Sequence, residues 1–225
     1  NCYAVLNPSA SKRIMIEAHI DEIGFQVTYI DDKGFVYVRQ NGGVDCATVP
    51  GSLVLIHTAD GTAVPGVIGK RPIHIQKPDE RTKVLELENL WIDTGLSHDE
   101  VLEKISVGDV VSYQANCSFL SENVIVSKGL DDKIGVYVVA EAIRRLSREN
   151  LNIGVYGVAA VQEEVGHRGA IVASKNINPA FAIVLEGTTC SDVPGTDEFG
   201  FSTHIGEGVA LSMRDGGCYS DVELT

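Results

Sequence analysis

Eight side chains that can bind metal ions or move protons lie next to the apolar segments of this sequence. One group follows residues 13–18, a second follows 153–161 and a third follows 181–185, while two aspartates open the segment that begins at 131. The set is His19, Asp21, Glu22, Asp131, Asp132, Glu163, Glu164 and Glu186. Because the ligand crevice of an open α/β sheet lies outside the carboxyl ends of its strands, we expect these side chains to converge on one crevice.

The residue types in this set predict a site for divalent metal ions. Several carboxylates in one crevice would repel each other strongly without cations. Imidazole and carboxylate ligands, with no cysteine among them, suit Zn, Co or Mn better than a thiolate zinc site. One histidine among many carboxylates suits two ions that share a bridging carboxylate.

The elements that must position these residues are buried strands that alternate with helices. Short apolar runs rich in branched side chains are typical of strands buried on both faces. The predicted strands of this kind are 13–18, 153–161 and 181–185. One helix is predicted after Asp131, with the apolar residues Ile134, Val138 and Ala142 on one face, and another is predicted to open at Gln162. This alternation indicates an α/β domain.

Residues 26–124 have a different pattern, with short alternating stretches separated by Gly-containing turns. This pattern predicts a small antiparallel barrel or sandwich. The clearest stretches are 35–38, 53–56 and 84–87. Ser97 followed by Glu100 is a capping-box signal for one short helix over 99–105. We therefore expect an α/β domain of residues 1–25 and 125–225, interrupted by an inserted β domain of residues 26–124.

Composition excludes several classes of function. The 225 residues include 18 Lys and Arg against 31 Asp and Glu, a net charge of −13, which argues against nucleic-acid binding. The apolar runs fall short of the ~18 residues that a membrane-spanning helix needs. Five cysteines without a CxxC pair suggest free thiols. With no apparent export signal, these features favour a cytoplasmic location.

Four strings carry a resemblance to a known family. They are residues 18–25 (AHIDEIGF), 128–135 (KGLDDKIG), 162–170 (QEEVGHRGA) and 186–189 (EGTT). In order and spacing they resemble the motifs of the M42 family of di-metal aminopeptidases, over nearly the whole chain. That family includes glutamyl aminopeptidases, deblocking aminopeptidases and tetrahedral TET peptidases, and some members carry an old endoglucanase label.

The resemblance implies a role for each residue of the site. His19, Asp131 and Glu186 would bind one metal ion, and Asp131 would bridge to a second ion held also by Glu164. The remaining roles are Glu163 as the general base, Asp21 as the residue that orients His19, and a cis peptide bond between Asp131 and Asp132.

The resemblance also implies a fold and an assembly. The catalytic domain would be of sandwich type, with a mixed sheet flanked by helices, and the inserted domain would be a small β-barrel. The inserted domain of the family drives dimerisation and assembly into a dodecamer, so a homo-oligomer acting on peptide substrates is expected.

The sequence departs from the family pattern at three places. The family takes the last ligand of the second ion from a histidine in a C-terminal His-Ser-Pro-like motif, and this sequence ends at Thr225 before such a motif. The family's opening helix is absent before Asn1, so we interpret the sequence as a fragment. His167 stands where the family usually has an apolar residue and is not assigned as a ligand. Asp192 is a candidate anchor for the substrate amino group.

Two other functions stay open from the sequence. A glycoside hydrolase that retains the anomeric configuration needs two carboxyl groups about 5–5.5 Å apart, and an inverting one needs them roughly 6.5–9.5 Å apart. Glu163 could form such a pair with Glu22 or with Glu186. Sugar sites usually offer aromatic platforms, however, and the one tryptophan, Trp91, lies in the β region. The third hypothesis is a non-catalytic assembly protein that lacks a working second metal site.

Overall fold

The structure is a computed structural model that describes residues 1–79, 81–83, 85–196 and 203–224. It divides into two compact units, Asn1–Leu185 and Glu186–Thr225. In the second unit the described residues form no helix or strand, although Arg214 and Tyr219 share an isolated β-bridge.

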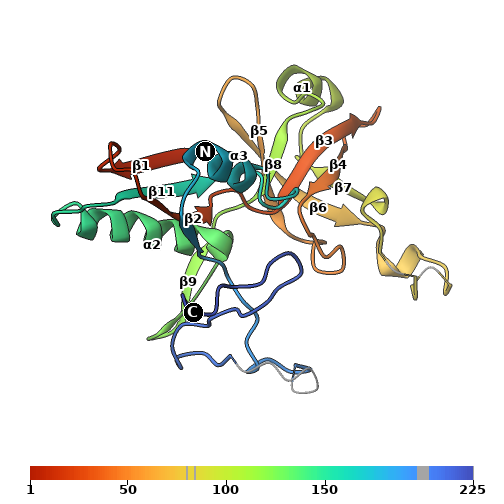
Figure 1. Cartoon of the computed structure of the whole chain (residues 1–225). Helices are drawn as coiled ribbons and strands as arrows, with labels where there is room; N and C mark the ends of the chain where they lie inside the picture. Colours follow the sequence, from red (N-terminus) through yellow and green to blue (C-terminus); the bar gives the residue numbers. More distant parts are fainter. Residues whose placement is uncertain (80, 84, 197–202, 225) are drawn as a thin grey trace. The chain divides into compact units, whose positions relative to one another are not determined.

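All helices and strands described lie in the first unit (Figure 1). The strands are β1 (Cys2–Leu6), β2 (Arg13–His19), β3 (Gly24–Ile30), β4 (Val36–Asn41), β5 (Leu53–His57), β6 (Ala63–Lys70), β7 (Leu90–Asp93), β8 (Val110–Tyr113), β9 (Cys117–Ser121), β10 (Val124–Ser127), β11 (Gly154–Ala160) and β12 (Phe181–Val184). The helices are α1 (His98–Lys104), α2 (Leu130–Leu146) and α3 (Arg168–Ile177), with short 3₁₀ turns η1 (Ile73–Ile75) and η2 (Leu87–Asn89).

A four-stranded mixed sheet carries the predicted site residues. Its strand order is β1-β11-β2-β12, in which β11, β2 and β12 are parallel and β1 runs antiparallel to β11. The strands predicted over 13–18 and 153–161 are confirmed as β2 and β11, and both are largely buried. The prediction that 181–185 is buried is wrong, because β12 lies at the edge of the sheet and its side chains are exposed.

Helices α2 and α3 pack against opposite faces of this sheet. Side chains alternate between the faces of a strand, so Met15 of β2 packs with α3 and the next residue, Ile16, packs with α2. Gly157 of β11 leaves room for α2, because a Cβ atom there would lie 2.7 Å from Cγ1 of Ile143 and 3.0 Å from Cγ1 of Val139.

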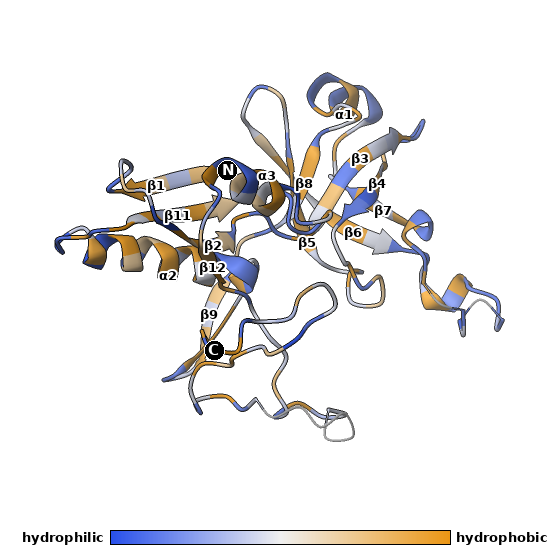
Figure 2. Cartoon of the chain, viewed as in Figure 1, coloured by the Kyte–Doolittle hydropathy of each residue, from blue (hydrophilic) through white to orange (hydrophobic). Residues whose placement is uncertain are grey.

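The two helices differ in detail from what the sequence pattern indicates. Of the residues that share the predicted apolar face of α2, Ala142 packs against the core but Ile134 and Val138 are exposed, and the helix buries Gly135 and Val139. Figure 2 shows hydrophobic residues along the length of α2, and this broad apolar pattern explains why periodicity alone does not identify the buried face. α3 begins at Arg168, because residues 162–167 form a turn in which the amides of Gly166 and His167 both donate to the carbonyl oxygen of Glu163.

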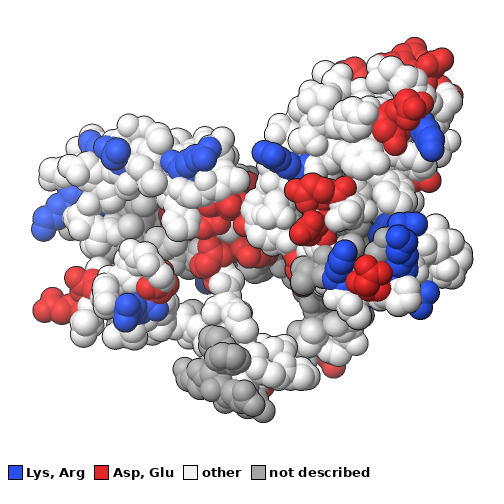
Figure 3. Space-filling model, turned by 90° about the vertical axis from the view of Figure 1, so that its right-hand side faces the viewer, with Lys and Arg blue, Asp and Glu red and all other residues white. Residues whose placement is uncertain are grey.

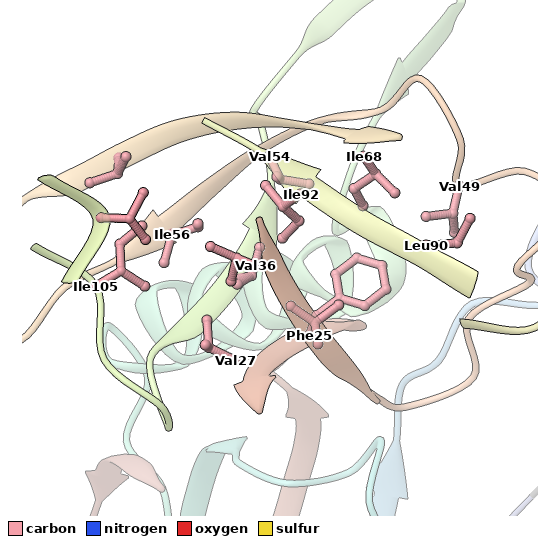
Figure 4. Packing of buried hydrophobic residues seen from close by; sticks show 14 residues of the cluster. Phe25, Val27, Val36, Val49, Val54, Ile56, Ile68, Leu90, Ile92 and Ile105 are labelled. Atoms are coloured by element: carbon pink, nitrogen blue, oxygen red, sulfur yellow. The ribbon is translucent and has the colours of Figure 1, made fainter. Parts of the chain in front are cut away.

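The β region forms a closed barrel with the strand order β3-β4-β7-β6-β5-β8. Inward side chains of its strands make the largest buried cluster, shown in Figure 4. Ten of its members are Phe25, Val27, Val36, Val49, Val54, Ile56, Ile68, Leu90, Ile92 and Ile105. α1 contributes Val101 to this core, and its capping box between Ser97 and Glu100 is confirmed.

The strand predicted over 84–87 is absent where the structure describes it. Val84 lies outside the described residues, Leu87 begins the 3₁₀ turn η2, and the strand starts only at Leu90. Leu85 and Leu87 still pack against the barrel core, which accounts for the alternating pattern without a sheet ladder.

Three further observations concern the cysteines, membrane-spanning helices and charge of the chain. All five cysteines are free thiols, as predicted. None of the described helices is long and apolar enough to cross a membrane. Figure 3 shows Asp and Glu side chains gathered near the middle of one face of the molecule, which is consistent with the net charge of −13.

Candidate metal centre

The parallel pairing of β2 and β11 brings two of the predicted clusters together. His19 is the last residue of β2 and lies opposite Ala160, the last residue of β11. The amide of Ile20 donates to the carbonyl oxygen of Ala160 over 2.8 Å, which keeps the two strand ends aligned. The turn that carries Glu163 and Glu164 therefore emerges beside His19.

His19 is buried and has a defined ring orientation. Its Nδ1 lies 3.0 Å from the main-chain carbonyl oxygen of Asp21, which can only accept a hydrogen bond, so Nδ1 carries a proton. Its Nε2 lies 2.9 Å from Oδ1 of Asp131. A neutral ring protonated at Nδ1 would present an acceptor to this carboxylate, so a proton or a cation must lie between the two atoms.

Asp132 fixes the main chain on both sides of this contact. Its side chain is fully buried and accepts hydrogen bonds from the amide of His19 over 3.3 Å and from the amide of Gly135 over 3.1 Å. Burial raises the pKa of the Asp132 carboxyl, and these hydrogen bonds oppose the rise. The peptide bond between Asp131 and Asp132 is cis, as predicted.

Asp21 holds the turn of the two glutamates. Its Oδ1 accepts the amide of Glu163 over 3.1 Å, and its Oδ2 accepts the amide of Glu164 over 3.2 Å. Its Oδ1 lies 3.6 Å from Nδ1 of His19, so the stronger contact to the histidine comes from the Asp21 carbonyl. Asp21 thus links the end of β2 to the turn that follows β11.

Glu163 and Glu164 complete the candidate site in this unit. One ligand atom each from His19, Glu163 and Glu164 lie within 4.8 Å of one another, a spacing that fits a shared metal ion. Burial raises the pKa of Glu164, and the negative charges of Asp131 and Glu163 add to the rise. This crowding of carboxylates is the electrostatic situation that cations relieve.

A cavity of about 590 Å³ opens beside the site, between the barrel and the sheet. Its lining includes Glu22, Tyr113, Lys128, Asp131 and Glu164. Three members of the predicted set, Glu22, Asp131 and Glu164, therefore face a space large enough for a small ligand.

Glu22, the remaining acid of the first cluster, is paired with lysines. Its Oε1 lies 2.7 Å from Nζ of Lys128 and its Oε2 lies 3.0 Å from Nζ of Lys133. Burial raises the pKa of Glu22, but the hydrogen bonds from the two lysines outweigh it and hold that pKa below its ordinary value. The negative charge of Glu22 is thus balanced by two lysine ammonium groups, which sets it apart from the carboxylates of the candidate metal centre.

Glu186 and Asp192 belong to the second unit. Glu186 directly follows Leu185, whose amide donates to the carbonyl oxygen of Glu17 in β2. Asp192 accepts the amide of Ile205 over 2.7 Å, and its Oδ1 lies 3.1 Å from Nδ1 of His204. Both contacts of Asp192 lie within its own unit.

Two residues near the centre were not assigned from the sequence. Glu17 is 3% exposed, and burial raises its pKa to about 6, although the charge of His19 opposes the rise. Its position two residues before His19, on the same face of the strand, was the available signal. His167 has its Nε2 2.9 Å from Oε1 of Glu163, and the i,i+4 spacing was the signal there.

The donor set fits divalent metal ions. Within the first unit it contains the imidazole of His19, whose Nε2 faces the carboxylate of Asp131, and the carboxylates of Glu163 and Glu164, ligand types that suit Zn, Co or Mn. His19 and Asp131 would offer a divalent ion two ligand atoms that already lie side by side.

Known proteins resemble this chain over most of its length. The family model described as M42 glutamyl aminopeptidase matches residues 1–225. A lysyl aminopeptidase of Pyrococcus furiosus is 35% identical over 192 residues, which cover 84% of this chain and 54% of that protein.

Solved structures agree with the sequence match. The aminopeptidase APDkam598 from the archaeon Desulfurococcus kamchatkensis has a TM-score of 0.82 and 39% identity, covering 92% of this chain and 56% of its own. PhTET1 of Pyrococcus horikoshii, described as a dodecamer, has a TM-score of 0.76 and 33% identity, covering 86% and 57% respectively. The chain spans somewhat more than half the length of each of these three relatives. By fold, by motifs and by sequence identity, this chain belongs to the M42 peptidase family.

Proposed function

We propose that the protein is a metal-dependent aminopeptidase that hydrolyses N-terminal residues from peptides through a water activated by two metal ions. The observation that carries the proposal is the 2.9 Å approach of His19 Nε2 to Asp131 Oδ1, two atoms that need a cation or a proton between them. Membership of the M42 family supports the same activity.

The proposed ligands divide between two ions of Zn, Co or Mn. His19, Asp131 and Glu186 hold the first ion, and Asp131 and Glu164 hold the second. When bound, these ions would supply Lewis-acid chemistry that lowers the pKa of a water and polarises the peptide carbonyl.

The chain's own residues supply the orientation and the proton transfer. His19 is held by the Asp21 carbonyl, and the amides of Glu163 and Glu164 are held by the Asp21 carboxylate. Glu163 accepts the proton of the attacking water and delivers it to the leaving amine. Adjacent positions on one turn allow Glu164 to serve the metal while Glu163 serves the substrate.

The domain organisation and the assembly are part of the proposal. Residues 1–25 and 125–225 form the catalytic domain, and 26–124 form an inserted domain through which copies of the chain associate. The closed barrel within 26–124 and the description of PhTET1 as a dodecamer support this assignment. The proposed partners are peptide substrates and further copies of the chain, in the cytoplasm, without nucleic acid or membrane.

The test compares substrates and metals in the full-length protein. Aminoacyl p-nitroanilides, free peptides and peptides with an acetylated N-terminus are incubated before chelation, after chelation, and after Zn, Co or Mn is restored. We expect release of N-terminal residues from the p-nitroanilides and peptides that carry a free amino group but not from the acetylated peptides, and this activity should be lost on chelation and regained with metal. Cleavage of a glucan that survives chelation would indicate a glycosidase instead. A protein that neither binds metal nor cleaves any peptide would be a non-catalytic assembly protein.

A further inference from the structure

We propose that His167 is a positioning residue for the carboxylate of Glu163, and this inference rests on the aminopeptidase function proposed above. The Nε2 atom of His167 lies 2.9 Å from Oε1 of Glu163. An ionised carboxylate only accepts hydrogen bonds, so Nε2 carries the proton of this contact. The contact therefore restrains the group proposed as the general base.

The main chain holds the His167 ring in place for this contact. The amide of His167 donates to the carbonyl oxygen of Glu163 over 2.9 Å, so both the backbone and the side chain of His167 contact the same glutamate. His167 has a left-handed backbone conformation, with φ of 54°, at the start of α3. Its carbonyl oxygen accepts the amide of Ile171 over 3.1 Å, which ties it to the helix.

The two oxygens of Glu163 face different histidines. Oε1 contacts His167, while Oε2 lies 3.9 Å from Nε2 of His19 at the candidate metal centre. The last torsion of a glutamate side chain has broad, nearly two-fold freedom. The hydrogen bond from His167 fixes the carboxylate plane, so that one oxygen stays directed toward the site where the attacking water is deprotonated.

The exposure of His167 separates this role from a role in folding. Its side chain is 69% exposed and that of Glu163 is 26% exposed. Exposed ion pairs and hydrogen bonds contribute little to stability because water competes for both partners. Loss of the imidazole should therefore change turnover while the melting temperature stays nearly constant.

Three substitutions in the full-length, metal-loaded protein test the role. His167→Leu removes the donor. His167→Gln places an amide donor near the position of Nε2, whereas the shorter amide of His167→Asn reaches only as far as Nδ1. For each variant, kcat and KM for the best aminoacyl p-nitroanilide, the metal content and the melting temperature are measured.

We expect kcat of His167→Leu and His167→Asn to fall by about 10- to 100-fold, the range typical of lost orienting contacts, with KM and metal content nearly unchanged. His167→Gln should recover most of the wild-type kcat. Wild-type kcat in His167→Leu, an equal loss in all three variants, or an effect on KM alone would overturn the positioning role while the aminopeptidase function stands. A wild-type protein that hydrolyses no substrate would overturn both proposals.

Discussion

Asp21 accepts a hydrogen bond from the main-chain amide of Glu163 over 3.1 Å, and this contact joins two segments that are 142 positions apart in the sequence. The amide of Glu164 donates to the other oxygen of the same carboxylate. The proposed general base and a proposed metal ligand are thus positioned through their backbone by one acid at the end of β2. Several consequences of this arrangement can be measured.

Asp21→Asn should weaken both metal binding and turnover. The new amide group places a donor against a main-chain donor, so one hydrogen bond is replaced by a repulsive contact. Loss of such an orienting partner typically costs about 10- to 100-fold in metal affinity or activity. Metal titration and kcat of the full-length variant provide the measurement.

Asp31→Asn is the control for loss of the charge of a turn carboxylate. Oδ1 of Asp31 accepts two turn amides in the barrel, those of Lys33 and Phe35, so the asparagine carbonyl can keep both hydrogen bonds. This variant should leave metal affinity and kcat unchanged. Equal losses in the two variants would show that loss of a turn carboxylate's charge, rather than the repulsive contact at the glutamate amides, impairs the protein.

Glu163→Gln and Glu164→Gln should separate proton transfer from metal binding. Glu163→Gln keeps the shape of the side chain but cannot accept a proton, so kcat should fall by about 10²- to 10⁴-fold while both ions remain bound. Glu164→Gln should lose the second ion as well as activity. Metal analysis by mass spectrometry alongside kcat distinguishes the two results, and loss of metal from Glu163→Gln would make Glu163 a ligand.

Glu17→Gln should stabilise the metal-free protein at high pH. Burial raises the pKa of Glu17 from 4.5 to about 6 in the folded state, so the folded protein binds more protons than the unfolded chain between these values. The free energy of unfolding of the wild type therefore falls as pH rises through this window and stays lower above it. At pH 8 the variant should exceed the wild type in this free energy by roughly 2 kcal/mol.

Urea unfolding of chelated wild type and Glu17→Gln at pH 5 and pH 8 measures this effect. The variant should gain over wild type mainly at pH 8, because Glu17 is largely protonated at pH 5. Glu122→Gln in the exposed turn between β9 and β10 is the control and should show the same small change at both pH values. An equal gain for Glu17→Gln at the two pH values would argue against burial of the charged form.

Gly157→Ala should destabilise the packing of α2 on the sheet. The added methyl group would lie 2.7 Å from Cγ1 of Ile143, and overpacking of this kind costs about 1–3 kcal/mol. The entropy gained by replacing glycine is smaller, about 0.4–1 kcal/mol. Gly43→Ala, where a Cβ atom meets nothing within 4 Å, should be neutral or slightly stabilising. A midpoint of urea unfolding that is equal in the two variants would contradict the packing.

The sequence was most informative where chemistry and burial coincide. Apolar strands ending in polar residues located His19 and the Glu163–Glu164 pair, because parallel strands end at the same edge of a sheet. The Ser97–Glu100 capping box located α1 because it acts through local hydrogen bonds.

Features that depend on tertiary contacts were not predictable in the same way. Apolar side chains occur on more than one side of α2, so only packing against the sheet decides that Val139 is buried and Ile134 is exposed. The edge position of β12 depends on strand order, which composition does not encode. The pairing of Glu22 with Lys128 and Lys133, and of Asp21 with the glutamate amides, joins segments more than a hundred residues apart.

The most direct test of the two-ion site is an anomalous diffraction map of the zinc-loaded, full-length protein. The proposal predicts two peaks, both in contact with Asp131, one also bound to His19 and the other to Glu164. Glu163 should stand outside the coordination of either ion. A single peak held by His19, Glu163 and Glu164, or zinc bound away from His19 and Asp131, would contradict the two-ion account.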